Sequence, residues 1–231
     1  MNDLMALGPM ASPRTWHQLG ILLLDGSGSM KREGKGGRPL ASDVNQAVKD
    51  FLGFFKGSSK ANNFSIAVIT FGEVAEEHTP STPLTQIDED ADYNPLLGHG
   101  DTTNIGAALE KAEKIALAHL AAPEAQGGVP HTAHIVILTD GLCLHPDHTR
   151  QVAERLRRQA GVELFGTLFT PRDVLRPTAP QEAAAAKELM RDVVGDDSRY
   201  KTTYDEAGLR DFFKKSMSAN VALATRTIAD L

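Results

Sequence analysis

The strongest constraint on the fold is the alternation of short, continuously apolar runs with longer segments of helical periodicity. The apolar runs are LGILLLD (19–25), FSIAVITFG (64–72), AHIVILTD (133–140) and VELFGTLF (162–169). Runs of this length without polar alternation are typical of strands covered on both faces, as in a parallel sheet. RYKTTY (199–204) predicts a further strand. EVAEEHT (73–79) alternates in polarity, which favours an antiparallel strand at an edge.

Helical patterns separate the predicted strands. Residues 39–56 and 104–120 place apolar side chains three and four positions apart. Further helices are predicted at 146–160, 180–194 and 205–223. Alternating strands and helices with right-handed crossovers predict a doubly wound α/β domain, with a mostly parallel sheet and helices on both faces. Without an internal repeat or low-complexity linker, we expect one domain over residues 1–231, with its core at about 18–222.

Composition narrows the class of protein. The net charge of −6 argues against nucleic acid or an anionic membrane as the main partner. The one cysteine, Cys143, excludes an internal disulfide and fits a reducing compartment. The first 20 residues lack the pattern of a signal peptide, and no apolar run reaches about 18 residues. We therefore expect a cytoplasmic protein, without a membrane partner and monomeric.

Two of the predicted strands end on an aspartate, Asp25 and Asp140. If both strands are parallel, both carboxylates emerge at the edge of the sheet where ligands bind in open α/β folds. Two carboxylates about 4 Å apart repel by roughly 4 kcal/mol at an effective dielectric constant near 20. No Lys or Arg lies within three residues of either aspartate. The repulsion therefore has to be offset by a shared proton, by a basic residue from elsewhere in the chain, or by a metal ion.

Hydroxyl side chains accompany these carboxylates. Ser27 and Ser29 follow Asp25 at alternate positions, and Gly26 and Gly28 between them permit a tight turn. The pair Thr102–Thr103 precedes the helix at 104–120. Mg²⁺ prefers about six oxygen ligands, some of them water, and this set of side chains fits that preference.

Three segments together resemble the von Willebrand factor type A (VWA) domain family. Asp25-Gly-Ser-Gly-Ser29 is similar to the family's D-x-S-x-S sequence, GDTTNIGAALEKA (100–112) to its Gly-x-Thr-Asn segment, and ILTDG (137–141) to its strand ending in Thr-Asp-Gly. The closing segment (200–221) is similar to the last helix of bacterial stand-alone versions from tellurium-resistance and stress-response systems.

The resemblance implies a metal-ion-dependent adhesion site that binds Mg²⁺, Mn²⁺ or Ca²⁺. By position, its ligands are Asp25, Ser27, Ser29, Thr103 and Asp140, with Thr103 preferred over Thr102 because it directly precedes Asn104. The resemblance further implies metal-dependent protein binding, in which an Asp or Glu of the partner completes the coordination of the metal, without turnover of a substrate. The alternative is a metal-dependent phosphohydrolase that uses Asp25, although such enzymes place a second aspartate where Ser27 stands.

Two other features leave a function open. The loop KREGKGGR (31–38) carries four basic residues and one acidic residue, and is either a plain surface loop or a contact for the partner. The histidine pairs 131/134 and 145/148 have spacings that zinc sites use, but neither pair has a third ligand nearby in sequence. We expect these histidines to be solvated loop and capping residues.

Overall fold

The computed structural model describes residues 15–34, 37–171 and 179–218. They form one six-stranded sheet with the order β3-β2-β1-β4-β5-β6. The strands are β1 (His17–Asp25), β2 (Phe64–Phe71), β3 (Ala75–Pro83), β4 (His131–Thr139), β5 (Val162–Phe169) and β6 (Tyr200–Thr203). All neighbouring strands are parallel except β2 and β3, which pair antiparallel at one edge. The predicted fold class is confirmed, including the antiparallel edge strand.

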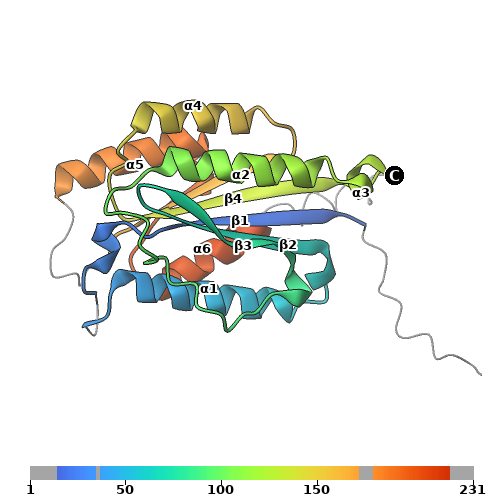
Figure 1. Ribbon diagram of the computed structural model, residues 1–231, viewed down its shortest axis with the longest axis horizontal. Helices are drawn as coiled ribbons and strands as arrows, with labels where there is room; N and C mark the ends of the chain where they lie inside the picture. The colour runs from blue at the N-terminus through green and yellow to red at the C-terminus, as the bar shows by residue number, and fades with distance from the viewer. Residues whose placement is uncertain (1–14, 35–36, 172–178, 219–231) are drawn as a thin grey trace, which may run out of the picture.

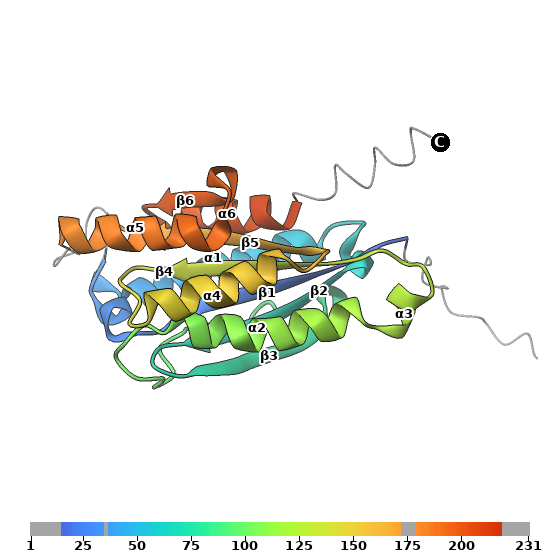
Figure 2. The ribbon, with the colours of Figure 1, turned by 90° about the horizontal axis from the view of Figure 1, so that it is seen from above.

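Helices cover both faces of this sheet (Figure 1). They are α1 (Leu40–Lys56), α2 (Ile105–Leu120), α3 (Pro123–Gln126), α4 (Pro146–Arg157), α5 (Pro180–Val194) and α6 (Glu206–Ser218). Helices α2, α4 and α5 lie side by side over one face (Figure 2), and α1 and α6 cover the other. The predicted helices agree within a few residues, although the expected extension of the last one to residue 223 lies outside the described ranges.

The alternation of side chains along β1 divides the core into two layers. Leu22 and Leu24 pack in the cluster formed with α1 and α6, whereas Leu19, Ile21 and Leu23 pack in the cluster under α2, α4 and α5. Every residue of β1 is buried because successive side chains point to opposite faces and both faces are covered. This explains why the strand is apolar without alternation.

The order of the strands fixes where a site can form. From β1 the chain builds β2 and β3 on one side, and then returns to build β4, β5 and β6 on the other. The carboxyl ends of β1 and β4 therefore meet at the topological switch point, where open α/β sheets bind ligands. Among the helices that the structure describes, none has the length and apolar character needed to cross a membrane.

Candidate metal centre

Asp25 is the last residue of β1, and Asp140 directly follows β4. Because β1 and β4 pair in parallel, with Leu24 opposite Leu138, both aspartates lie at the same edge of the sheet. Both are buried. The expectation that the two strand ends meet is confirmed.

Both oxygens of the Asp25 carboxylate accept hydrogen bonds. The backbone N–H of Ser27 donates to Oδ1 at 2.8 Å, and the hydroxyl of Thr139 donates to Oδ2 at 2.5 Å. Burial and the nearby Asp140 carboxylate nevertheless raise the pKa of Asp25 to about 7, against the effect of these hydrogen bonds. Thr139 was missed at the sequence level, although it directly precedes Asp140. The negative charge on Asp25 is therefore costly without a nearby cation.

A chain of hydroxyl contacts leads from the first loop to Asp140. The Oγ atoms of Ser27 and Ser29 lie 3.0 Å apart, and Ser29 Oγ donates to Asp140 Oδ1 at 2.5 Å. Ser27 and Ser29 thus point toward the carboxylate of a strand more than 100 residues away in sequence. The structure brings four oxygen-bearing side chains together here: Asp25, Ser27, Ser29 and Asp140.

Arg32 also reaches this cluster, and no local sequence pattern indicated it. Its guanidinium Nη2 lies 2.5 Å from Asp140 Oδ2, and its Nε donates to the backbone carbonyl of Ser29 at 3.0 Å. A basic residue from elsewhere in the chain therefore offsets part of the repulsion between the paired carboxylates. The short helical turn Gly28–Lys31 brings Arg32 back over the end of β4.

Two further basic residues of the 31–38 loop also make ion pairs. Lys31 lies 2.8 Å from the exposed carboxylate of Asp101, and Arg38 lies 3.5 Å from Asp43. Lys35 lies outside the described residues. A role of this loop in binding a partner stays a prediction.

Of the two glycines of the first loop, Gly26 is needed because a side chain there has no space. Neither Gly26 nor Gly28 has a positive φ, so the turn that they were expected to permit does not depend on a left-handed backbone at either position. A Cβ atom on Gly26 would lie 1.9 Å from the carbonyl oxygen of Pro95. At Gly28 the nearest atom would be Asp101 Oδ1, at 3.1 Å. Only Gly26 is pressed against backbone.

The two threonines before α2 have different environments. Thr103 is buried and Thr102 is exposed, and both line a surface pocket together with Ser29 and Arg32. The N-cap of α2 is Asn104, whose side chain accepts from the backbone N–H of Ala107 at 3.2 Å. Thr103 therefore does not cap α2.

Exposed apolar side chains lie beside the polar centre. Leu142 and Leu144, about half exposed, line the same pocket, and Cys143 between them is buried. Three further exposed apolar side chains of the described residues lie in loops at this edge of the sheet: Val74, Leu97 and Tyr204. Exposed apolar groups around a polar centre are typical of surfaces that bind proteins.

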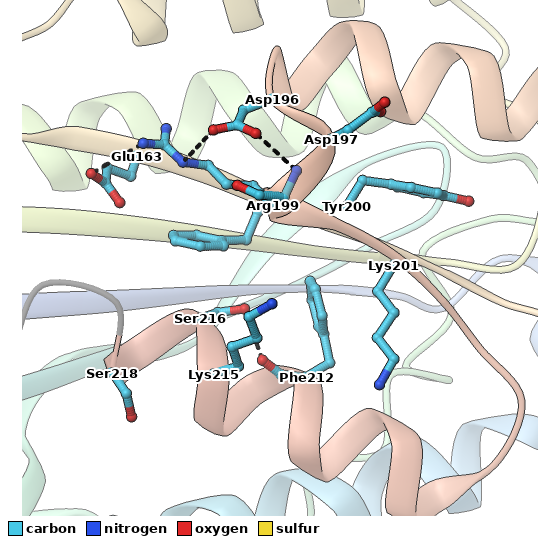
Figure 3. A pocket seen from close by; sticks show the side chains of 12 residues that line it. Glu163, Asp196, Asp197, Arg199, Tyr200, Lys201, Phe212, Lys215, Ser216 and Ser218 are labelled. Atoms are coloured by element: carbon cyan, nitrogen blue, oxygen red, sulfur yellow. Dashed lines mark hydrogen bonds and ion pairs between the residues drawn. The ribbon is translucent and has the colours of Figure 1, made fainter.

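A second pocket lies beside β6, on the side of α6 (Figure 3). Its principal charge, Arg199, already pairs with Glu163 at 3.3 Å and with Asp196 at 3.9 Å. These groups neutralise one another, and the cluster contains none of the predicted site residues.

The histidine pair 131/134 differs from expectation, whereas the pair 145/148 lies at a helix start as expected. His131 and His134 both lie in β4 and are buried, so the prediction that they are solvated loop or capping residues was wrong. His145 and His148 lie at the start of α4, where His145 is the N-cap residue without a side-chain cap bond.

The family model of the von Willebrand factor type A domain matches residues 21–142. This segment includes all five predicted ligands, Asp25, Ser27, Ser29, Thr103 and Asp140. No curated protein sequence matches the chain.

Solved structures share the fold at low sequence identity. The pilus adhesin SpaC from Lactobacillus rhamnosus GG aligns with a TM-score of 0.67 and 12% identity, over 88% of this chain and 30% of that one. A von Willebrand factor type A protein from Catenulispora acidiphila aligns with a TM-score of 0.61 and 17% identity, over 88% of this chain and 43% of that one. Proximal thread matrix protein 1 from the mussel byssus, with a zinc-occupied MIDAS motif, aligns with a TM-score of 0.57 and 14% identity, over 90% of this chain and 49% of that one. This chain thus spans less than half the length of each, and the likeness establishes the fold.

We predict that Gly26→Ala damages the site and Gly28→Ala does not. A methyl group added at position 26 would collide with the backbone of Pro95, whereas at position 28 the nearest atoms are those of the Asp101 side chain at 3.1–3.4 Å, a contact that a shift of a few tenths of an ångström relieves. Overpacking of this kind costs about 1–3 kcal/mol, and we expect Gly26→Ala to reach the upper part of that range. Urea unfolding of both variants measures the difference. Equal stability of the two variants would contradict the assigned role of Gly26.

A second prediction concerns pH in the presence of EDTA. Folded Asp25 keeps its proton up to about pH 7, whereas the unfolded chain loses it near 3.8. The folded state therefore binds more protons between these values, so this residue makes the free energy of unfolding fall as pH rises. The variant Asp25→Asn has no titrating group at this position, so its stability lacks this dependence on pH. At pH 7 its free energy of unfolding should exceed that of the wild type by a few kcal/mol, since each unit of difference in pKa between the folded and unfolded states corresponds to about 1.4 kcal/mol.

Urea unfolding of both proteins at several pH values between 4 and 7.5 tests this. The stability difference between Asp25→Asn and wild type should grow with pH and be smallest at the acid end. A difference that stays constant over this range contradicts the raised pKa of Asp25.

Proposed function

Because the chain belongs to the von Willebrand factor type A domain family, we propose that it is a binding module that holds one divalent cation and uses it to bind another protein. The ligands are Asp25, Ser27, Ser29, Thr103 and Asp140. The cation is Mg²⁺, with Mn²⁺ or Ca²⁺ as substitutes. The observation that carries this proposal is the continuous set of contacts among Asp25, Ser27, Ser29 and Asp140.

The chemistry of the donors suits a hard cation. All five side chains offer oxygen, two of them as carboxylates, which is the ligand set that Mg²⁺ and Ca²⁺ prefer. The buried Asp25 carboxylate, with a pKa of about 7, gains most from a nearby positive charge. When bound, the ion offers an open coordination position to an incoming ligand. The protein's own residues hold the site in place, chiefly through the hydrogen bonds of Thr139 and Ser27 to Asp25.

The surroundings support a protein partner. Leu142 and Leu144 lie beside the centre and provide apolar area, while the ion attracts a carboxylate, so an Asp or Glu of the partner can complete the coordination. The net charge of −6 does not favour nucleic acid. From the resemblance of the closing segment, we place this module in the cytoplasm, in a bacterial stress-response or tellurium-resistance system.

The geometry of Asp25 speaks against the alternative of a phosphohydrolase. A nucleophilic carboxylate needs an oxygen that can reach the substrate. Asp25 is 0% exposed, and each of its oxygens accepts a hydrogen bond. Assay of the Mg²⁺-loaded protein on a generic aryl phosphate separates the two functions, because turnover that Asp25→Asn abolishes would establish the enzyme.

The two threonines provide the direct test of the ligand set. We expect Thr103→Ala to weaken Mn²⁺ or Mg²⁺ binding roughly tenfold, or about 1.4 kcal/mol, and Thr102→Ala to leave it within about twofold. Thr103 does not cap α2, so both variants should keep nearly the stability of the wild type in EDTA. Titration calorimetry gives the affinities, and capture of partners with and without EDTA gives the functional consequence. If only Thr102→Ala loses metal binding, the ligand is Thr102 and not Thr103.

Arg32 provides an independent test. Its guanidinium lies on Asp140, so it competes with a divalent cation for the same carboxylate. Arg32→Gln should therefore bind Mn²⁺ several-fold more tightly than the wild type. The matched control is Lys31→Gln, since Lys31 pairs with the exposed Asp101. Weaker binding by Arg32→Gln would mean that Arg32 holds Asp140 in place for the metal.

A further inference from the structure

Three histidines far apart in sequence meet at the opposite end of the sheet. His17 begins β1, His131 begins β4, and His119 lies in the last turn of α2. The ring centroids of His119 lie 4.7 Å from those of both His17 and His131, which are 5.1 Å from each other. The cluster is near α3, at the right end of the molecule in Figure 1.

The fold explains why these rings converge. His17 and His131 are opposite one another in the parallel pairing of β1 and β4, so their side chains leave the sheet on the same face. Leu19 and Ala133, two residues further along each strand, pack in the cluster under α2. The last turn of α2 then brings His119 over this end of the same face.

The hydrogen bonds orient the ring nitrogens. His131 Nδ1 lies 2.7 Å from the carbonyl of Val129, and because a carbonyl only accepts, Nδ1 carries the proton and Nε2 has the lone pair. That Nε2 is buried and has no hydrogen-bond partner among the described residues, in a side chain only 9% exposed overall. His17 Nε2 bonds to Ser65 Oγ at 2.9 Å, and His17 Nδ1 lies 3.9 Å from Oε2 of Glu124.

We propose that His17, His119 and His131 form a second metal site, selective for ions of the Zn²⁺, Co²⁺ and Ni²⁺ class. One nitrogen of each ring lies within 4.8 Å of those of the other two. In a tetrahedral zinc site with Zn–N of about 2.1 Å the distances between ligand nitrogens are about 3.4 Å, so small ring rotations complete the site. Glu124 supplies the fourth ligand, because its exposed carboxylate lies 3.9 Å from His17 Nδ1.

This site is separate from the oxygen-lined centre in place and in chemistry. It lies at the amino end of β1, whereas Asp25 lies at the carboxyl end, roughly 26 Å away at about 3.3 Å per residue. Imidazole nitrogen prefers zinc-like ions, and carboxylate and hydroxyl oxygen prefer Mg²⁺ and Ca²⁺. The bound ion ties α2 and α3 to β1 and β4. The inference does not depend on the proposed binding function.

Cobalt titration of the full chain tests the site. An Asp25→Asn, Asp140→Asn background removes the charged ligands of the oxygen-lined centre. In this background we expect one equivalent of Co²⁺ to bind with the intense visible absorption of a tetrahedral complex, and Zn²⁺ to displace it. His119→Gln and His131→Gln should each weaken binding at least tenfold. His145→Gln is the matched control, since it changes an exposed histidine at the start of α4, and should leave the affinity unchanged.

A ligand replacement keeps the test decisive if a glutamine variant fails to fold. His119→Cys retains a ligand, so it should still bind Co²⁺ and add a thiolate-to-cobalt absorption in the near ultraviolet. Absence of Co²⁺ binding, or binding that persists in a folded His119→Gln, His131→Gln double variant, would overturn the site and leave only packed rings. Neither outcome affects the Mg²⁺ measurements at the other end of the sheet.

Discussion

The parallel pairing of β1 with β4 is the constraint on which the rest of the structure depends. The two strands are not consecutive in the sequence. Their pairing places Leu24 opposite Leu138 and His17 opposite His131. At the carboxyl ends this pairing brings two carboxylates to one edge, and at the amino ends it brings two imidazoles to one face. The same ladder of backbone hydrogen bonds therefore creates both candidate sites, and the different side chains at its two ends give them different chemistry.

Electrostatics at the carboxyl end explains the residues around Asp25. A buried carboxylate beside a second one is unfavourable, and the rise of the Asp25 pKa to about 7 expresses that cost. Hydrogen bonds from Thr139 and Ser27 offset part of it, and Arg32 neutralises Asp140. A divalent cation offsets the remainder more directly. In the proposed site the protein would hold the ligands in shape, and a bound ion would compete with Arg32 for Asp140.

The amino end follows a different logic, because neutral imidazoles do not repel one another as carboxylates do. His17, His119 and His131 can therefore pack against each other within a mostly apolar layer. The bond from His131 Nδ1 to Val129 fixes the tautomer and presents a lone pair toward the interior. A metal at this end would hold α2 and α3 against the sheet and would not form part of a binding surface.

The sequence by itself determined the strand–helix alternation, the antiparallel edge strand and the approach of Asp25 to Asp140. Each of these depends on local periodicity or on the rule that parallel strands end at one edge. Only the tertiary structure decided the position of Arg32 on Asp140, the closeness of Pro95 to Gly26 and the meeting of three histidines. Except for His119 and His131, the residues in these contacts are between 69 and 114 positions apart in the sequence. No local sequence pattern encodes contacts over such distances. Spacing along the chain reports which residues share an element, whereas the packing of elements decides which side chains touch.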